Sequence, residues 1–304
     1  MRIRHGLSRV LMSVALPKKG RPPEELFAVM RKRKSADADW RGGKTWSLIY
    51  PAGEEVDGVL KQANEMYMYE NALNPLRFPS LREMEAEVVS MTAGLLGGGE
   101  AAGGSMTSGG TESILLAVKT ARDKAREERG VKRPQLLVPD SAHPAFAKAA
   151  RYLGLELGKI PLAHDLRADV AAAEKLIGER TVLLVGSAPN YPHGLIDPIE
   201  DLAALASSHG ISFHTDACVG GFMLPFLERL GHDIPPFDLR VPGVTTISAD
   251  VHKYGYATKG ASVILHADSS TLRHQYFLYE DWPGGLYGSA AMAGARPAAP
   301  VAAA

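Results

Sequence analysis

From Gly103 onward, short apolar segments alternate with segments of helical periodicity, and this alternation constrains the fold of the 304-residue chain more than any other feature. The expected strands are 136–138, 156–160, 181–185, 211–214, 244–248 and 261–265. The expected helices between them are 111–128, 144–153, 168–178 and 198–208. Such alternation is typical of an α/β fold with a mostly parallel sheet that helices cover on both faces.

This expected sheet also predicts where a ligand binds. In open α/β sheets the ligand site lies at the carboxyl ends of the strands, so the residues that follow each strand are the candidates for chemistry. Residues 61–289 are expected to form this large domain. Residues 1–60 are expected to dock on it or on a partner subunit, with 1–16 as an amphipathic docking segment. The Ala- and Pro-rich tail 290–304 is expected to be disordered.

The composition excludes several classes of protein. Lys and Arg together number 34, as do Asp and Glu, so the zero formal net charge gives no reason to expect nucleic acid as a partner. No apolar run approaches the roughly 18 residues that a membrane-spanning helix needs. Cys218 is the only cysteine, so a reducing, cytoplasmic setting is expected. Neither zinc-binding spacings nor a Gly-x-Ser-x-Gly elbow occurs, so we predict no metal site and no serine hydrolase.

A glycine-rich stretch, 106–113, leads into the helix expected at 111–128. It contains Gly109, Gly110 and Thr111. Glycines let the backbone approach an anion closely, and the free N–H groups and dipole of a helix start favour a phosphate. An ordinary turn with Thr111 as the helix cap explains the same residues equally well.

Two polar residues that follow apolar strands suit one aromatic cofactor, pyridoxal 5′-phosphate (PLP). Asp216 ends a strand, where a carboxylate is costly to bury unless a cation such as a protonated pyridine nitrogen pairs with it. That pair would make the ring an electron sink. Lys253 follows strand 244–248 and suits Schiff-base formation, for which burial and a neighbouring His252 would lower its pKa. Either residue alone has an ordinary explanation, so the prediction rests on the pair.

His143 follows the strand expected at 136–138. A flat imidazole at that place would stack on a bound aromatic ring and transfer protons. The alternative is a histidine that caps the next helix, which the motif taken alone slightly favours.

These stretches together resemble the group II PLP-dependent decarboxylases, and most closely the sphingosine-1-phosphate lyases among them. The most specific match is 248–260, which reads Ser-Ala-Asp-Val-His-Lys-Tyr-Gly-Tyr followed by Lys-Gly; ordinary amino-acid decarboxylases share only part of it. The other matches occur in family order along nearly the whole chain, at 16–20, 74–76, 78–81, 106–113, 141–143, 192–194, 197–198, 214–221, 281–282 and 284–287.

The resemblance implies a type I PLP fold that acts as a homodimer, and it implies residue roles position by position. Lys253 would form the Schiff base with PLP, Asp216 would pair with the pyridine nitrogen, and His143 would stack on the ring. Ser187 would lie near the ring hydroxyl. The residues implied for the cofactor phosphate are Gly109, Gly110, Thr111 and His252. The residues implied for the phosphate end of the substrate are Asn74 and Lys259.

The implied reaction is retro-aldol cleavage of a phosphorylated long-chain amino alcohol, which yields phosphoethanolamine and a fatty aldehyde. PLP stabilises the carbanion that carbon–carbon scission produces. Decarboxylation of an L-amino acid is the alternative within the same superfamily. It needs an arginine that binds the substrate carboxylate, and Arg296 is the candidate for that role.

Two departures from the family pattern lead to a third hypothesis. Family members continue into a smaller C-terminal domain that this chain is expected to lack, and 288–297 differs from the usual family sequence. The chain is then a truncated, non-catalytic remnant that binds PLP weakly or folds only with a partner chain. Membrane-bound relatives carry an N-terminal anchor, which is also expected to be absent.

Overall fold

A computed structural model describes residues 15–304, so most of the docking segment expected at 1–16 lies outside the described residues. The chain divides into two compact units, Met1–Ile49 and Tyr50–Ala304. In the first unit, helix α1 spans Pro23–Lys34. It starts with proline, has acidic residues in its first turn and basic residues in its last turn, which is the arrangement that the helix dipole favours.

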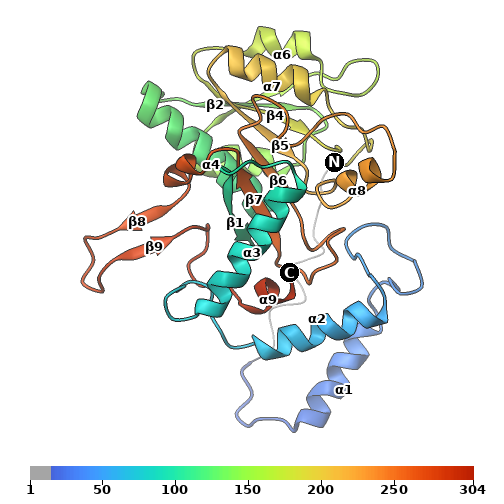
Figure 1. The fold of residues 1–304 in the computed structure, drawn as a ribbon. Coiled ribbons are helices and arrows are strands. Elements are labelled where there is room, and N and C mark those ends of the chain that lie inside the picture. Colours follow the sequence, from blue (N-terminus) through green and yellow to red (C-terminus); the bar gives the residue numbers. More distant parts are fainter. Residues whose placement is uncertain (1–14) are drawn as a thin grey trace. The chain divides into compact units, whose positions relative to one another are not determined.

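The second unit is built on a seven-stranded sheet with the order β1-β7-β6-β5-β4-β2-β3 (Figure 1). Its strands are β1 Gly103–Thr107, β2 Gln135–Pro139, β3 Glu156–Ile160, β4 Thr181–Ser187, β5 Ser212–Asp216, β6 Thr246–Ala249 and β7 Ser262–His266. Strands β3, β2, β4, β5 and β6 pair in parallel, and β7 pairs antiparallel with both β6 and β1. The expected mostly parallel α/β sheet is confirmed.

Helices cover both faces of this sheet. The helices of the second unit are α2 Glu54–Met66, α3 Pro79–Leu95, α4 Gly110–Arg129, α5 Ala145–Leu153, α6 Val170–Leu176, α7 Ile199–Ser208, α8 Leu224–Arg229, α9 Ala299–Ala303 and the 3-10 helix η1 Ser269–His274. Leu183 and Val185 of β4 belong to an apolar cluster that includes side chains of α4 and α5, whereas Leu184 belongs to another that includes side chains of α3, α6 and α7. Successive strand residues point to opposite faces, so one strand supplies both cores.

The parallel strands place their carboxyl ends at one edge of the sheet, hereafter the carboxyl edge. The ends of β2, β4, β5 and β6 lie there because these strands are parallel. The end of β1 lies there too, since β1 and β6 both run antiparallel to β7. The loops that follow these strands carry the residues that the sequence predicted to form a site.

The C-terminal tail 290–304 is ordered, so the expectation of disorder is wrong. Pro297 forms a β-bridge with Asn71, and α9 packs against α2 and α3 with Pro300 and Val301 buried. The Ala- and Pro-rich composition was misleading, because these side chains lose little conformational entropy on burial and are small enough to fit between helices. The observed unit boundary after Ile49 also differs from the one expected at residue 60.

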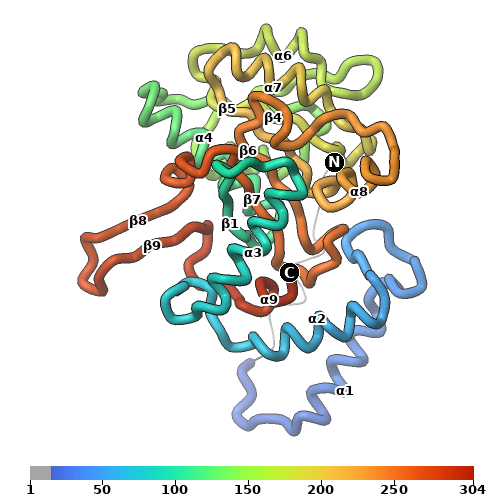
Figure 2. The backbone as a smooth tube through the Cα atoms, in the orientation of Figure 1, coloured from blue at the N-terminus to red at the C-terminus, as the bar shows by residue number. Residues whose placement is uncertain are grey.

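Two further elements were not expected. Strand β1 is not among the expected strands, yet Gly104 suits a strand because a side chain there would collide with the carbonyl oxygen of Ile264. Strands β8 (Phe277–Tyr279) and β9 (Tyr287–Ser289) form a hairpin outside the main sheet, which is easiest to follow in Figure 2. Within residues 15–304, no helix combines the length and the apolar character that crossing a bilayer requires.

Candidate active site

The glycine-rich turn between β1 and α4 forms one side of the site. Gly109 caps α4 with φ 152° and ψ 166°, a conformation that favours glycine. A Cβ atom on Gly110 would lie 2.6 Å from Sγ of Cys218 and 2.9 Å from Oδ1 of Asp250, so no side chain fits there. The N–H groups of Gly110 and Thr111 lie in the first helical turn, where they have no intrahelical partner. Since Gly109 is the N-cap, Thr111 is not.

Glu112 holds this turn in shape. Its Oε2 atom accepts hydrogen bonds from the backbone N–H and the hydroxyl of Ser108, each at 2.7 Å. Its Oε1 atom accepts a 2.8 Å hydrogen bond from the backbone N–H of Met292. A carboxylate at a helix start also suits the helix dipole. The ordered C-terminal segment therefore helps to fix the turn through a hydrogen bond to Glu112.

Lys253 lies in the turn after β6, paired with a carboxylate that the sequence analysis overlooked. Its Nζ atom is 2.9 Å from Oδ2 of Asp250, which also lies 3.6 Å from Nε2 of His252. Burial disfavours the ammonium, but Asp250, with Cys218 and Asp216, outweighs burial and raises the pKa of Lys253. The predicted lowering of this pKa is therefore wrong, because a carboxylate at hydrogen-bond distance stabilises the charged form.

Asp216 ends β5 at the same carboxyl edge. The residue is buried, and its Oδ1 atom accepts a 3.1 Å hydrogen bond from the backbone N–H of Cys218. It pairs in register with Ser187 of β4 and Ser248 of β6. Asp216 is also close enough to Lys253 to help raise the pKa of that residue. The two residues on which the sequence prediction rested thus share one edge of the sheet.

Ser187 lies beside Asp216 at the end of β4. Its hydroxyl is buried, and among residues 15–304 it has no hydrogen-bond partner. Its backbone N–H donates to Oδ2 of Asp197 at 2.8 Å, and Oδ1 of Asp197 accepts from Ala168 N at 3.0 Å. Burial raises the pKa of Asp197. The serine backbone is thus fixed while its hydroxyl remains available to a ligand.

His252 and Lys259 lie next to the glycine turn and at the rim. A Cβ atom on Gly109 would lie 3.4 Å from Cε1 of His252, and burial lowers the pKa of this histidine. The Nζ atom of Lys259 donates to the carbonyl oxygen of His252 at 2.9 Å and lies 5.0 Å from the centre of the Tyr50 ring. Burial and the charge of Lys253 lower the pKa of Lys259. Lys259 therefore places an amine at the rim of the site.

The residues present fit a phosphorylated aromatic aldehyde. We call the group Gly109, Gly110, Asp216, Asp250, His252 and Lys253 the site cluster. The buried polar atoms Ser187 Oγ, Asp250 Oδ1 and His252 Nδ1 have no hydrogen-bond partner within the described chain, which is unusual unless a ligand engages them. The glycine turn offers N–H groups to a phosphate, and Lys253 offers an amine to an aldehyde. No group of three or more potential metal ligands occurs in the same described part.

His143 and Asn74 lie in loops, and both already make local hydrogen bonds. His143 is exposed after β2, and its Nδ1 atom accepts at 3.1 Å from the backbone N–H of Ala145, the first residue of α5, whose N-cap is Pro144. The side-chain oxygen of Asn74 accepts from the backbone N–H groups of Leu76 and Arg77 at 3.1 and 3.2 Å. Among the described residues, no hydrogen bond or ion pair joins either one to the site cluster. Their predicted roles remain predictions.

Arg296 does not suit the role of a substrate anchor. Its guanidinium makes two hydrogen bonds to the carboxylate of Glu85, at 3.0 and 2.8 Å, and others to the carbonyl oxygens of Met106 and Ala72. Its donors are therefore used to fasten the C-terminal segment to α3 and β1. The structure corrects the prediction that Arg296 binds a substrate carboxylate.

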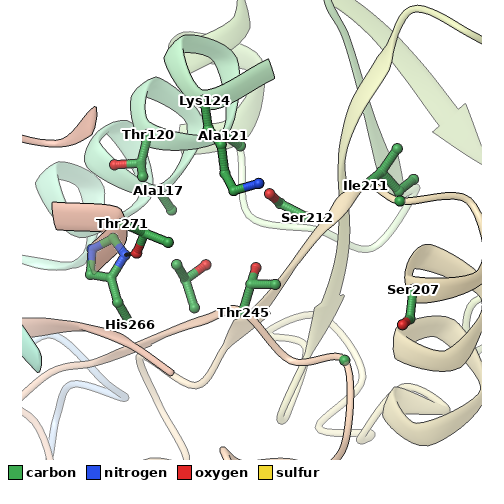
Figure 3. A pocket seen from close by; sticks show the side chains of 13 residues that line it. Ala117, Thr120, Ala121, Lys124, Ser207, Ile211, Ser212, Thr245, His266 and Thr271 are labelled. Atoms are coloured by element: carbon green, nitrogen blue, oxygen red, sulfur yellow. Dashed lines mark hydrogen bonds between the residues drawn. The ribbon is translucent and has the colours of Figure 1, made fainter. Parts of the chain in front are cut away.

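A cavity of about 260 Å³ lies at the opposite edge of the sheet, where β5 and β6 begin. Figure 3 shows α4 side chains on one side of it and, on the other, side chains from strands and loops together with Ser207 of α7. Its lining is mostly small and hydroxyl-bearing: Ala117, Thr120, Ala121, Lys124, Ser207, Gly210, Ile211, Ser212, Gly243, Thr245, Thr246, His266 and Thr271. Its lining includes none of the predicted site residues, so this cavity is separate from the residues gathered at the carboxyl edge.

The known proteins to which this chain is similar agree with a pyridoxal phosphate site at the carboxyl edge. Residues 44–282 match the pyridoxal-dependent decarboxylase conserved domain. The sphingosine-1-phosphate lyase of Arabidopsis thaliana is 48% identical over 286 residues, 91% of this chain and 52% of that protein. A sphingosine-1-phosphate lyase structure from Burkholderia pseudomallei is 42% identical with a TM-score of 0.89, and the match covers 96% of this chain and 69% of that one. A probable L-aspartate decarboxylase of Pyrococcus furiosus is 37% identical over 285 residues, 94% of this chain and 75% of that protein.

These matches identify the family of the chain, but they cover only part of the length of its relatives. The chain spans about half the length of the curated sphingosine-1-phosphate lyases that it matches. The structural match confirms the large-domain fold of a type I PLP enzyme that the sequence predicted. The chain belongs to the pyridoxal-dependent decarboxylase family, is similar within it to sphingosine-1-phosphate lyases, and so has pyridoxal phosphate as its implied cofactor.

Proposed function

We propose that the chain is a PLP-dependent carbon–carbon lyase that cleaves a phosphorylated sphingoid base to phosphoethanolamine and a fatty aldehyde. The observation that carries this proposal is the gathering of Lys253, Asp216 and the glycine turn at one edge of the sheet. The similarity to a sphingosine-1-phosphate lyase over 96% of the chain supports this substrate class.

Three residues would serve the reacting end of the substrate. When bound, PLP supplies the sink for the electrons of the broken carbon–carbon bond. Lys253 would provide the amine that holds the aldehyde carbon of PLP until the substrate amine displaces it. Asp216 would keep a proton on the pyridine nitrogen, because a buried carboxylate needs a cation beside it. His143 would cover the ring.

The other predicted site residues would recognise a phosphate or the ring hydroxyl. The N–H groups of Gly110 and Thr111, with His252, would bind the cofactor phosphate. The unpartnered hydroxyl of Ser187 would contact the ring hydroxyl. At the rim, Lys259 would bind the substrate phosphate. The side-chain oxygen of Asn74 is already in use, so only its amide N–H₂ group would remain to donate to that phosphate.

The direct test is an aldehyde assay on PLP-loaded protein. Incubation with a sphingoid base phosphate should release a long-chain aldehyde and phosphoethanolamine in equal amounts. The Lys253→Ala variant should release neither, although it still unfolds in one cooperative transition; its midpoint should fall, because Asp250 loses its counter-ion. If folded, PLP-loaded protein releases no aldehyde, the proposed function is wrong.

Decarboxylation of an L-amino acid is the second candidate. The relative from Pyrococcus furiosus, a probable L-aspartate decarboxylase, favours it. The ion pair between Arg296 and Glu85 weakens it, because the expected carboxylate anchor is already occupied. Release of carbon dioxide from L-aspartate, in place of aldehyde from the sphingoid substrate, would select this candidate.

We also propose that the protein is a cytoplasmic homodimer, as the resemblance implies. The exposed apolar side chains of the β8–β9 hairpin and its loop, among them Leu278, Trp282 and Leu286, support an interface with a second copy. Light scattering on the PLP-loaded protein should give twice the chain mass. A monomer at micromolar concentration would contradict the dimer.

A further inference from the structure

Asp250 lies between the glycine turn and Lys253, and the proposed function assigns it no role. Its side chain is 3% exposed. Its Oδ2 atom lies 2.9 Å from Nζ of Lys253, and a Cβ on Gly110 would lie 2.9 Å from Oδ1 and 3.0 Å from Oδ2. Oδ1 has no hydrogen-bond partner among residues 15–304. One oxygen therefore binds the amine, the other has no partner in the described chain, and the carboxylate as a whole lies against the glycine turn.

We propose that Asp250 is a positioning residue that keeps Lys253 protonated in the cofactor-free protein, and thereby sets the pH range over which the protein captures pyridoxal phosphate. This inference rests on the proposed cofactor site. A buried carboxylate is costly without a counter-ion, so the pair is mutually stabilising.

The other charged groups around Lys253 do not replace Asp250. Asp216 faces it from β5, but its Oδ1 atom accepts from the backbone of Cys218. Burial raises the pKa of the Cys218 thiol, so that thiol is neutral near pH 7. His252 and Lys259 lie on the same loop as Lys253, and any positive charge on them opposes the ammonium. Among these groups, Asp250 alone has a carboxylate oxygen at hydrogen-bond distance.

The consequence for cofactor capture follows from the chemistry of amines. An ammonium has no lone pair, so Lys253 must lose a proton to solvent before its nitrogen can attack an aldehyde carbon. The new nitrogen–carbon bond then forms while the aldehyde oxygen leaves as water. An opposite charge at this distance shifts a pKa by about 1 to 3 units, so Asp250 reduces the fraction of neutral amine about 10- to 1,000-fold.

The test compares Asp250→Asn with the unchanged full-length chain, both freed of cofactor. The rate of capture is followed by visible absorbance between pH 6 and 10, with pyridoxal phosphate and with pyridoxal as probes. Asp250→Asn should capture both aldehydes about tenfold faster or more at pH 7 to 8, because a larger fraction of its Lys253 is neutral there. Asp250→Ser should also accelerate capture. Asp169→Asn, which changes the N-cap of helix α6, should leave the rate unchanged.

A second readout does not depend on the cofactor. Competitive acetylation followed by peptide mass spectrometry reports the neutral fraction of Lys253, with exposed Lys132 as internal reference. Faster acetylation of Lys253 in Asp250→Asn supports the inference, whether or not the protein binds pyridoxal phosphate. Failure to bind pyridoxal phosphate would refute only the proposed function. Unchanged acetylation, or an acceleration confined to the phosphorylated aldehyde, would overturn the inference, because the carboxylate would then act on phosphate and not on the amine.

Discussion

The two edges of the central sheet differ in what they enclose. At the carboxyl edge, the site cluster packs charged and unpartnered polar groups tightly around glycine backbone. At the amino edge of β5 and β6, a cavity of about 260 Å³ is lined by hydroxyl groups, many of which are already bonded within the protein. A cavity by itself does not mark the amino edge as the site of chemistry. The site is instead expected at the carboxyl edge, where buried polar atoms without hydrogen-bond partners are concentrated. Burying such atoms costs free energy, and proteins keep them mainly where they bind a ligand.

A pair of lysines, one taken from each edge, tests this comparison. Lys253 is held by Asp250, whereas Lys124 lines the cavity and pairs with Glu128 one turn along α4. Lys253→Ala should abolish the visible absorbance of bound pyridoxal phosphate, while Lys124→Ala should retain it. Titration of each purified variant with the cofactor measures this difference, and loss of binding in both variants, or only in Lys124→Ala, would break the comparison.

Adding one methyl group should damage the carboxyl edge. In Gly110→Ala the new Cβ would lie 2.6 Å from Sγ of Cys218, so the turn must shift. Overpacking of this kind costs about 1 to 3 kcal/mol of unfolding free energy, and cofactor affinity should fall at least about tenfold because the phosphate site moves. Gly178→Ala, with open space around the Cβ, is the matched control. Urea unfolding and cofactor titration measure both effects; equal values for the two variants would contradict tight packing.

Lowering the pH should reduce the unfolding free energy through His266, a histidine that lines the cavity at the amino edge. Its Nδ1 and Nε2 atoms bond to Thr271 and Gln275, and burial lowers its pKa to about 4. The unfolded chain therefore takes up a proton near pH 6.5, before the folded chain does. The contribution of neutral, buried His266 to the unfolding free energy is complete above pH 6.5, and it is lost as the pH falls toward 4. It amounts to about 1 to 2 kcal/mol between pH 7 and 5.

The variant His266→Gln should reduce that pH dependence, because glutamine does not titrate. Urea unfolding at pH 7 and pH 5 measures the difference in unfolding free energy. The exposed histidine His209 provides the control variant His209→Gln, which should keep the full dependence. Equal slopes in both variants would show that His266 is not the responsible group.

The smallest effect is expected for a hydroxyl in the cavity lining. Thr120 is 3% exposed, and its hydroxyl has no partner within the described residues. Thr120→Val keeps the shape and removes an unsatisfied group, so stability should be unchanged or rise by up to about 1 kcal/mol. Cofactor affinity should not change. A weaker affinity in this variant would link the two edges and contradict their independence.

Sequence reasoning found the sheet and the pair Asp216 and Lys253, because strand periodicity and the ends of parallel strands are local signals. It overlooked Asp250, although the argument used for a carboxylate at the end of β5 applies equally at the end of β6. Other misses depend on contacts between distant segments. The tail is ordered because Arg296 reaches Glu85, a partner 211 residues away, and β1 is a strand because Gly104 permits close contact with β7.

The central claim is that the amine of Lys253 reacts with pyridoxal phosphate at the carboxyl edge. Borohydride reduction of the cofactor-treated protein, followed by peptide mass spectrometry, identifies the lysine that carries the label. One phosphopyridoxyl group per chain on the peptide that contains Lys253 is the predicted result. A label on Lys124, or one spread over many surface lysines with none at Lys253, would contradict the account.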